Sequence, residues 1–324
     1  MVRPGGGGVP AATGQEPGPA GGVLRNGAGR GSPRRVTTGS GGRTGRAAGL
    51  SVGVGRVLAA GERVLLVDPK QRRYLVRLRA GETFHTHAGV IAHDDIIGKP
   101  EGSTVVGSTG RGFLAFRPTL ADVVLKMPRG AQVIYPKDLG AILIAADVGP
   151  GQRILEAGVG SGALSMALLR AGASVVGYEL REDFAQRARQ NVTEQLGEEV
   201  DYRIELADVT QGVSDDGFDR VILDLPEPWA VVPHAARVLR PGGIFLAYLP
   251  TINQTGLLRA SLAASGFALA ETQEILRRTW HVEARSIRPD HRMVAHTGFL
   301  TTARLLAGGA GRTEGAEAGV SPAR

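Results

Sequence analysis

Hydrophobic and polar residues alternate in two neighbouring runs near the start of the chain, residues 63–67 and 73–79, with the turn signal Asp68-Pro69-Lys70 between them. A period of two is typical of strands, so the runs predict a β-hairpin. The alternation places three arginines of the second run on one face: Arg73, Arg77 and Arg79. Glycine-rich loops at 98–102 and 107–112 complete the pattern of a small β-barrel or sandwich.

From about residue 118 the pattern changes to apolar runs that alternate with helical segments. The predicted strands are 153–157, 174–179, 203–206, 218–223 and 243–249, and the predicted helices are 137–147, 163–170 and 183–195. This order predicts an α/β fold with a doubly wound parallel sheet and a ligand beyond the carboxyl ends of its strands. Two final strands, 267–279 and 296–304, are expected to pair as an antiparallel hairpin.

A glycine-rich turn, Gly158-Val159-Gly160-Ser161-Gly162, joins the first strand of the predicted sheet to the following helix. Glycines at such a turn let the backbone and the helix N-terminus approach a nucleotide-like ligand. Glu179 ends the next strand, 21 positions after Gly158, where an acid accepts hydrogen bonds from ribose hydroxyls. The turn alone also suits NAD, so the pattern predicts a nucleoside site and leaves the cofactor open.

Further side chains near the same edge of the sheet allow more than one interpretation. Asp208 follows the third strand and is placed to meet an adenine amine, and Asp224 follows the fourth. Aspartate after a strand is commonly a helix N-cap, which is the alternative for Asp224. Glu156 is charged within an apolar strand, and a buried acid needs a polar partner, which the amides of the turn or an amino group of the ligand would supply. Phe184 suits packing on an adenine ring and the core equally well.

The net charge of +7, from 38 Lys and Arg against 31 Asp and Glu, lies mostly at the N-terminus. Residues 1–49 hold seven arginines and one glutamate, a local charge of +6, together with 16 of the 48 glycines. Such a segment buries too little apolar surface to offset the entropy of ordering it, which predicts a disordered tail. The chain then divides into the tail 1–49, a small β-rich domain 50–117, a larger domain 118–306 and a second tail 307–324.

Composition excludes several classes of protein. The chain has no cysteine and therefore no disulfide, thiol nucleophile or zinc ribbon. His85, His87 and His93 look only superficially like a metal cluster, and we expect them to be structural and the protein to hold no metal. No apolar run reaches the roughly 18 residues needed to cross a bilayer, and no secretory signal is present. These observations predict a soluble, cytoplasmic protein.

Residues 155–162 followed by Glu179 resemble motif I and the second acid of class I S-adenosylmethionine-dependent methyltransferases. Four further segments resemble the TrmI family, in the same order: Gln132-Val133-Ile134-Tyr135-Pro136-Lys137-Asp138, Asp224-Leu225-Pro226-Glu227-Pro228-Trp229, Tyr248-Leu249-Pro250-Thr251 and His296-Thr297-Gly298-Phe299-Leu300. The resemblance covers roughly residues 50–306 and implies a Rossmann-like fold with a small N-terminal β domain. It implies a homotetrameric enzyme that methylates N1 of adenosine 58 in the T-loop of tRNA. We expect no membrane and no DNA partner.

The resemblance also assigns roles to single residues. Those expected to bind S-adenosylmethionine are Glu156, Gly158, Val159, Gly160, Ser161, Glu179, Phe184, Asp208 and Asp224. Tyr135 and Tyr248 are expected near the target base, where an aromatic face suits stacking on a flipped adenine. Because adenine N1 already carries a lone pair, positioning matters more than a strong base. Asp224 is the expected catalytic residue, accepting a hydrogen bond from the exocyclic amine and stabilising the charge that develops on the ring.

Two basic segments are candidates for contact with tRNA. The first is the strand face of Arg73, Arg77 and Arg79, and the second is the connection 277–292, with five arginines against two acids. The connection fits either a phosphate-contacting lid or a solvated hairpin. Deleting the tail 1–49 is expected to leave methylation largely intact, whereas neutralising Arg73, Arg77 and Arg79 is expected to weaken tRNA binding and flatten its salt dependence.

Three other functions remain alternatives. A methyltransferase for a small molecule or a protein would need no basic surface. A non-catalytic tRNA-binding subunit would keep the fold without an intact site, whereas Gly158, Glu179 and Asp224 are all present. An NAD-dependent oxidoreductase is disfavoured because no hydride-transfer site is recognisable.

Overall fold

The computed structural model describes residues 56–127, 130 and 132–308. The predicted tail 1–49 lies outside these residues, and so does the predicted tail 307–324 beyond residue 308. Within the stretches that are described, no helix has both the length and the apolar character needed to span a membrane.

The first described part of the chain is a small β structure made of two antiparallel sheets, ordered β2-β1-β6-β5 and β3-β4. Its elements are β1 (Arg63–Val67), β2 (Arg73–Arg77), β3 (Thr83–Thr86), β4 (Gly89–Ala92), the 3-10 helix η1 (His93–Asp95), β5 (Ser103–Val106) and β6 (Gly112–Phe116). The pairing of β1 with β2 confirms the predicted hairpin, although β2 ends at Arg77. Leu66, Ile91 and Phe113 are fully buried in a core that both sheets share.

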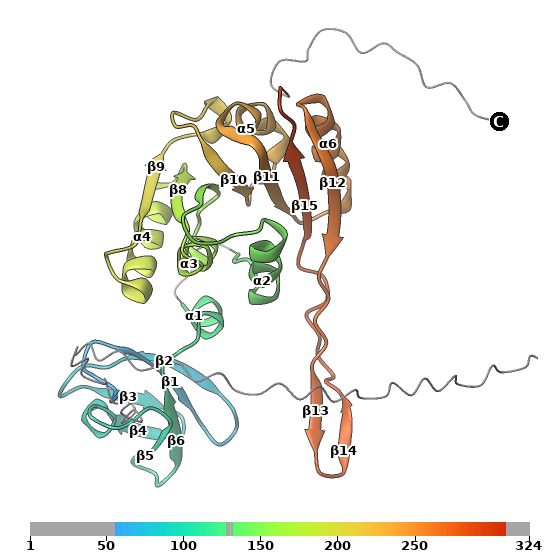
Figure 1. Cartoon of the computed structure of the whole chain (residues 1–324). Coiled ribbons are helices and arrows are strands. Elements are labelled where there is room, and N and C mark those ends of the chain that lie inside the picture. Colours follow the sequence, from blue (N-terminus) through green and yellow to red (C-terminus); the bar gives the residue numbers. More distant parts are fainter. Residues whose placement is uncertain (1–55, 128–129, 131, 309–324) are drawn as a thin grey trace, which may run out of the picture. The chain divides into compact units, whose positions relative to one another are not determined.

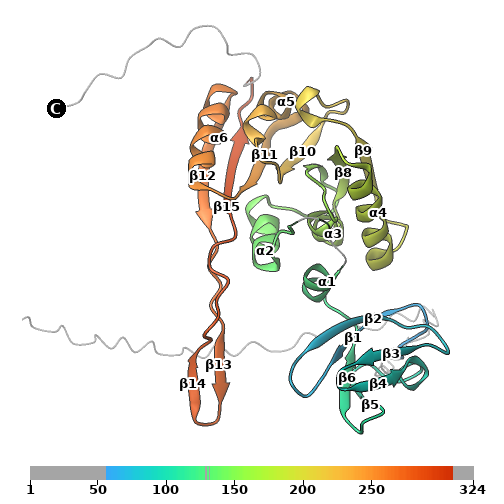
Figure 2. The ribbon, with the colours of Figure 1, turned by 180° about the vertical axis from the view of Figure 1, so that it is seen from behind.

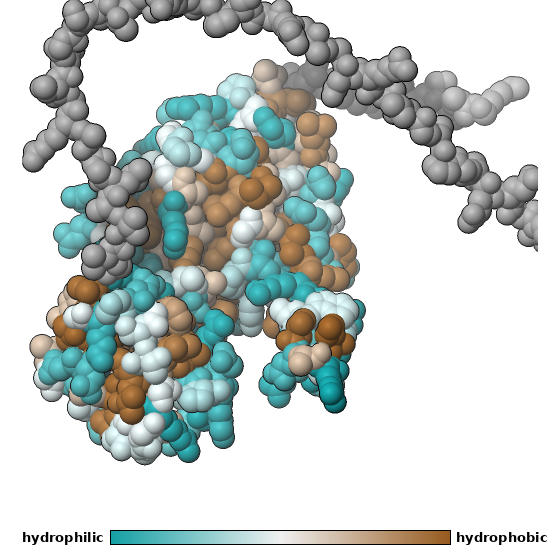
Figure 3. Space-filling model, turned by 60° about the horizontal axis from the view of Figure 1, so that its bottom comes forward, coloured by the Kyte–Doolittle hydropathy of each residue, from teal (hydrophilic) through white to brown (hydrophobic). Residues whose placement is uncertain are grey.

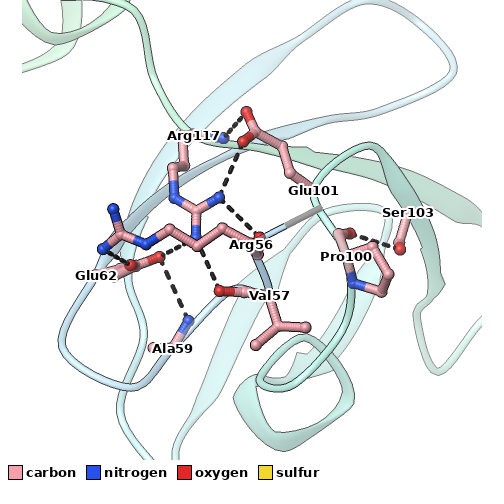
Figure 4. A network of polar contacts seen from close by, with 8 residues as sticks. All are labelled: Arg56, Val57, Ala59, Glu62, Pro100, Glu101, Ser103 and Arg117. Carbon is pink, nitrogen blue, oxygen red and sulfur yellow. Dashed lines mark hydrogen bonds and ion pairs between the residues drawn. The ribbon is translucent and has the colours of Figure 1, made fainter. Parts of the chain in front are cut away.

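Arg117, directly after β6, holds one edge of this small structure together (Figure 4). Its Nη1 donates hydrogen bonds to Arg56 O and Glu101 Oε2, both at 3.0 Å. Its Nη2 donates to Val57 O at 2.8 Å and to Glu62 Oε2 at 2.9 Å. A guanidinium has five N–H donors in a planar fork, so one side chain fixes several acceptors. The positive charge of Arg117 is therefore neutralised by Glu62 and Glu101 within the small β structure.

A seven-stranded sheet with the order β12-β15-β11-β10-β7-β8-β9 forms the centre of the remaining chain (Figure 1). Its strands are β7 (Arg153–Ala157), β8 (Ser174–Glu179), β9 (Tyr202–Leu206), β10 (Phe218–Leu223), β11 (Leu239–Leu249), β12 (Phe267–Glu274) and β15 (Phe299–Leu305). Strands β11, β10, β7, β8 and β9 are parallel, and β15 is antiparallel to both β11 and β12. The predicted α/β sheet and its final antiparallel pair are thus confirmed, while β11 begins earlier than predicted, at Leu239.

Helices cover both faces of this sheet. They are α2 (Pro136–Ala145), α3 (Ala163–Arg170), α4 (Glu182–Leu196), α5 (Val232–Val238) and α6 (Ile252–Ala264), with short 3-10 turns η2 (Val209–Gln211) and η3 (Pro228–Ala230). A further helix, α1 (Leu120–Lys126), packs against α2, α3 and β2. Successive residues of β7 face opposite sides, so Ile154 packs in the core with α2 and α3, and Leu155 in the core with α5. The sheet is therefore buried on both faces, as a parallel sheet requires.

A two-stranded arm separates β12 from β15 and consists of β13 (Trp280–Glu283) paired with β14 (Ser286–Pro289). Figures 1 and 2 show the chain leaving the sheet after β12, running out to this hairpin and returning to β15. The predicted strand 267–279 is therefore too long, because β12 ends at Glu274, and β15 begins at Phe299 rather than at 296. The structure shows a hairpin in the basic connection, and its contact with a substrate stays a prediction.

Candidate functional site

The glycine-rich turn lies where the carboxyl ends of three neighbouring strands meet. Gly158 N donates to Tyr178 O of β8 at 3.1 Å, and Asp224 N, directly after β10, donates to Ala157 O of β7 at 2.9 Å. Gly158 has a φ of +82°, and a Cβ at this position would overlap the backbone carbonyl of Asp224. Only glycine therefore allows the turn to lie against the strand end that carries Asp224.

Glu179 links the turn to the end of β8. Its Oε2 accepts a hydrogen bond from Gly160 N and its Oε1 accepts one from Arg181 N, each at 3.0 Å. A carboxylate offers about four lone-pair directions, so these two bonds leave room for further donors such as ribose hydroxyls. The predicted role of Glu179 is compatible with this geometry.

A hollow of about 290 Å³ lies beside Glu179 and has the chemistry of a nucleoside site. Its lining includes Gly158, Glu179, Leu180, Asp208, Val209 and Leu225. Asp208 Oδ1 accepts hydrogen bonds from Thr210 N at 2.9 Å and from Thr210 Oγ1 at 2.7 Å, and these bonds lower the pKa of Asp208. Asp208 is therefore ionised at neutral pH and is able to accept a hydrogen bond from an amine, between apolar side chains that suit a base.

A second, smaller hollow shares Gly158 with the first and lies at the turn itself. It is lined by residues 158–161, 132–134, the first residues of α3 and Asp224. The Ser161 hydroxyl is buried here without a hydrogen-bond partner among the residues the structure describes. Burial raises the pKa of Asp224 to about 7. Both observations indicate a site whose polar groups are completed by a ligand.

Glu156 lies beneath this hollow, fully buried in β7. Its Oε2 accepts a hydrogen bond from Ser165 Oγ at 2.7 Å, while its Oε1 has no partner among the described residues. Burial, together with the nearby charges of Asp224 and Glu179, raises the pKa of Glu156 to about 8. Among the described residues the partner of Glu156 is thus Ser165 and not an amide of the turn, and Glu156 lines neither hollow.

Three carboxylates thus lie near the turn: those of Glu156, Glu179 and Asp224. None of them forms an ion pair with a lysine or arginine of the described chain. A ligand with a nucleoside at one end and a positive charge near the turn matches this arrangement, since opposite charges favour ionised carboxylates. S-adenosylmethionine has this form, with adenosine attached to a sulfonium. The residues present thus fit the cofactor that the sequence resemblance implies.

The two apolar residues expected to contact the cofactor, Phe184 and Val159, differ in their position. Phe184 is half-buried and belongs to neither hollow, and the guanidinium of Arg181 lies 3.8 Å from its ring centroid. Val159 lines the smaller hollow and packs on its other side against α4. The geometry thus offers support for a cofactor contact at Val159 and none at Phe184.

The two predicted substrate tyrosines lie close enough to each other that Tyr135, like Asp224, bears electrostatically on Tyr248. Tyr135 is the N-cap residue of α2, and Tyr248 lies near the end of β11. Burial raises the pKa of Tyr248 to about 12, with further contributions from the charges of Asp138 and Asp224. A side chain at Gly298 would overlap the Tyr248 ring, so Gly298 allows β15 to pass close to it. Tyr248 is thus held beside the predicted catalytic residue.

The sequence reading missed one polar cluster next to these tyrosines, formed by Lys137, Asp138 and Thr297. All three residues stand in the motifs quoted for the family, but a Pro-Lys-Asp sequence at a helix start looks like ordinary capping. The only indication of this cluster in the sequence was that segments 132–138 and 296–300 both resemble motifs of the same family.

The arginines expected to contact tRNA differ in whether they form ion pairs within the protein. Arg73 pairs with Asp122 at 2.8 Å, Arg77 with Glu194 at 3.0 Å and Arg79 with Glu82 at 3.5 Å. By contrast, five arginines of the arm segment form no ion pair with the rest of the described chain: Arg277, Arg278, Arg285, Arg288 and Arg292. The arm therefore offers more unpaired positive charge than the strand face.

The histidines that look like a metal cluster in the sequence have separate structural partners. His93 is buried and its Nδ1 accepts a hydrogen bond from Arg79 N at 3.0 Å. His85 Nε2 lies 3.1 Å from Thr83 Oγ1. Among residues 56–127, 130 and 132–308, no group of three or more His, Asp or Glu is arranged to hold a metal ion.

Comparison with known protein families gives two matches that together span most of the described chain. Residues 113–297 match the family described as "tRNA methyltransferase complex GCD14 subunit", and residues 57–105 match "TrmI-like N-terminal". The chain is 33% identical over 269 residues to the tRNA (adenine(57)-N(1)/adenine(58)-N(1))-methyltransferase TrmI of Methanocaldococcus jannaschii, covering 74% of this chain and 94% of that protein. It is 36% identical over 245 residues to the tRNA (adenine(58)-N(1))-methyltransferase TrmI of Thermus thermophilus, covering 74% and 96%.

Solved structures of similar fold agree with these matches. A SAM-dependent O-methyltransferase from Thermotoga maritima has a TM-score of 0.74 and 34% identity, covering 78% of this chain and 95% of that chain. The tRNA (m1A58) methyltransferase TrmI of Aquifex aeolicus has a TM-score of 0.70 and 31% identity, covering 78% and 100%. The similarity includes the central sheet and extends beyond it, since both structures cover more of this chain than the sheet and its helices alone.

Proposed function

The chain belongs to the TrmI family of tRNA methyltransferases, and from this premise we propose that it transfers a methyl group from S-adenosylmethionine to N1 of adenosine 58 in the T-loop of tRNA. One structural observation carries the proposal. Gly158, Glu179 and Asp224 meet at one edge of the sheet, with Tyr248 beside Asp224. A cofactor site and a place for a planar base thus adjoin the same carboxylate.

The chemistry needs little from the protein except placement and charge. S-adenosylmethionine supplies a methyl group on a sulfonium whose sulfur leaves as a neutral thioether. The lone pair of adenine N1 forms the new N–C bond, so the positive charge moves to the ring and no proton must first be removed. Asp224 in its ionised form accepts a hydrogen bond from the exocyclic amine and stabilises that charge. Tyr135 and Tyr248 orient the extruded base by stacking.

The decisive experiment uses the full chain, S-adenosylmethionine labelled in its methyl group and unmodified tRNA, followed by digestion to nucleosides. Label in 1-methyladenosine that maps to position 58 supports the proposal. Label that enters protein or a small molecule and not RNA would overturn it in favour of a different methyltransferase. Tight tRNA binding without any transfer would overturn it in favour of a non-catalytic subunit.

We propose that the arm grips the tRNA backbone. Trp280 is 56% exposed, Val282 68% and Ile287 69%, and Figure 3 shows hydrophobic and hydrophilic side chains gathered together at the end of the arm. An exposed tryptophan among unpaired arginines suits a nucleic-acid surface, because a base stacks on its ring while phosphates pair with guanidinium groups. The target adenosine must leave its stack to be methylated, so a hold on the surrounding backbone is required.

Replacing Arg278, Arg285 and Arg288 by glutamine is expected to weaken tRNA binding by about 10- to 100-fold and to reduce the slope of log affinity against log salt by about two to three. The comparison variant is the triple change of Arg73, Arg77 and Arg79 to glutamine, which the sequence also predicts to weaken tRNA binding. Because each of these arginines already has an acidic partner, we expect its effect on affinity and on the salt slope to be smaller than that of the arm variant. Filter binding at several salt concentrations measures both effects. Equal slopes for the arm variant and the wild type would exclude the arm as a phosphate contact.

We further propose the finer assignments that the family resemblance implies. Residues 50–117 serve as a tRNA-contacting domain and residues 118–306 as the methyl-transfer domain. The protein acts as a homotetramer in the cytoplasm and uses no metal. Light scattering on the purified full chain tests the assembly, and unchanged methylation in the presence of a strong chelator tests the last point.

A further inference from the structure

A buried hydrogen-bonded cluster fastens the start of α2 to the base of the arm. Lys137 Nζ donates to Asp138 Oδ1 at 2.8 Å, to Ile275 O at 2.6 Å and to Thr297 Oγ1 at 2.5 Å. Thr297 Oγ1 donates to Asp138 Oδ2 at 2.6 Å. The Lys137 side chain is 5% exposed and the Asp138 side chain is fully buried. Every N–H of the ammonium therefore has an acceptor, and both carboxylate oxygens have a donor.

The cluster lies at the point where the arm leaves the sheet. Ile275 is the first residue after β12, and Thr297 is the second residue before β15, so the cluster holds both segments that connect the arm to the sheet. The neighbouring residues are also held, because His296 lies 2.7 Å from Glu274 Oε1 through Nδ1 and 2.9 Å from Pro250 O through Nε2. The arm thus leaves the sheet from a fixed base and not from a free loop.

The same cluster borders the expected position of the target base. The charge of Asp138 raises the pKa of Tyr248 and the hydroxyl of Thr297 lowers it, so both side chains act on the Tyr248 hydroxyl. Gly298, next to Thr297, lies directly against the Tyr248 ring. Lys137 follows Tyr135 by two positions in the first turn of α2. One cluster therefore sets the relative positions of both tyrosines and of the base of the arm.

The energetics favour a positioning role over a purely stabilising one. Burying an ion pair costs desolvation that its attraction does not generally exceed, and well-packed apolar side chains often stabilise a protein equally well. What an ion pair with fixed hydrogen bonds adds is a unique geometry. Positioning groups around a reacting base within a fraction of an ångström has a large effect on the rate of transfer.

We propose that Lys137, Asp138 and Thr297 are positioning residues that couple the arm to the expected position of the target base. When the arm binds tRNA, the cluster holds the target adenosine in the correct position relative to Asp224. The inference rests on the proposed function, since it concerns how that substrate is oriented. It requires that loss of the cluster affects the transfer step more than the binding of tRNA or of S-adenosylmethionine.

The test compares Thr297→Val, which removes the hydroxyl at nearly constant volume, with Thr297→Ser, which restores it. Thr272→Val is the matched control, because Thr272 pairs with Thr301 at 2.9 Å between β12 and β15, the strands that precede and follow the arm, and takes no part in the cluster. We expect Thr297→Val to lower the single-turnover rate of methyl transfer about 30-fold or more, with tRNA and S-adenosylmethionine dissociation constants within about threefold of wild type. Thr297→Ser and Thr272→Val are expected to stay within about threefold of wild type in every measurement.

A single-turnover rate for Thr297→Val equal to that of Thr272→Val would overturn the proposal, as would a loss confined to tRNA affinity. If Thr297→Val fails to fold, the double change Lys137→Met and Asp138→Leu replaces the buried pair by apolar side chains and is judged by the same criteria. Wild-type protein that forms no 1-methyladenosine would refute the proposed function itself. Active wild type together with an active Thr297→Val refutes only the coupling.

Discussion

Replacing Asp224 by asparagine is expected to lower the rate of methyl transfer by about 100-fold or more while changing S-adenosylmethionine affinity by less than about tenfold. Asparagine keeps the size of the side chain and one acceptor oxygen, but it loses the negative charge that faces the developing positive charge on the adenine ring. Single-turnover methylation and equilibrium binding of the cofactor separate the two effects. Unchanged single-turnover methylation would falsify the catalytic assignment, and Asp224→Ala is expected to behave in the same direction.

The pH dependence of transfer provides the control for this role. Because the pKa of Asp224 is raised to about 7, half of the free protein carries a protonated, uncharged group near neutral pH. The wild-type rate at low cofactor and tRNA concentrations is therefore expected to rise through pH 7 and then to level off. Asp224→Asn is expected to lack this step. Identical pH profiles for the two proteins would assign the titration to another group.

The same raised pKa has a consequence for stability. The folded protein binds a proton at Asp224 more tightly than the unfolded chain does. The contribution of Asp224 to the free energy of unfolding is therefore fully present below about pH 4 and is lost as the pH rises to about 7. The loss above pH 7 is on the order of a few kcal/mol. Asp224→Asn is therefore expected to unfold at a higher temperature than wild type at pH 8 and at the same temperature near pH 4.

The meeting of the predicted cofactor-binding residues at one edge of the sheet was predictable because it depends on local features of the chain. Gly158 follows a strand directly, and Glu179, Asp208 and Asp224 each stand at the end of a strand. In a parallel sheet the carboxyl ends of the strands share one edge, so sequence position alone places these residues together. The seven-stranded sheet follows from the same apolar runs.

The parts that sequence did not reveal depend on contacts between distant residues. Lys137 and Thr297 are 160 positions apart, and no local pattern indicates that their side chains meet. The strand periodicity correctly separated Arg73 and Arg77 from the apolar face, but it carries no information about their acidic partners Asp122 and Glu194. A count of charges along the sequence therefore overestimated the unpaired positive charge of the small β structure. It also gave no sign that the arginines of the arm are unpaired.

Gly158→Ala is expected to abolish measurable transfer, to weaken S-adenosylmethionine binding about 100-fold or more and to lower the free energy of unfolding by about 2–4 kcal/mol. Two physical effects add at this position. The φ of +82° strains any residue with a Cβ, and the added methyl group would overlap the carbonyl oxygen of Asp224. Because that oxygen belongs to the backbone, the overlap is removed only when the turn and the end of β10 move apart. This movement distorts the cofactor hollow and displaces Asp224.

Gly151→Ala separates the two effects, because Gly151 has a nearly equal φ of +77° but no atom within 4 Å of the added Cβ. It is expected to cost only about 1 kcal/mol, from the left-handed conformation alone, and to leave methylation and cofactor affinity near wild type. Thermal or urea unfolding, calorimetric binding and single-turnover transfer on both variants test the comparison. If Gly158→Ala matched Gly151→Ala in all three, the close approach of the turn to Asp224 would not be what assembles this site.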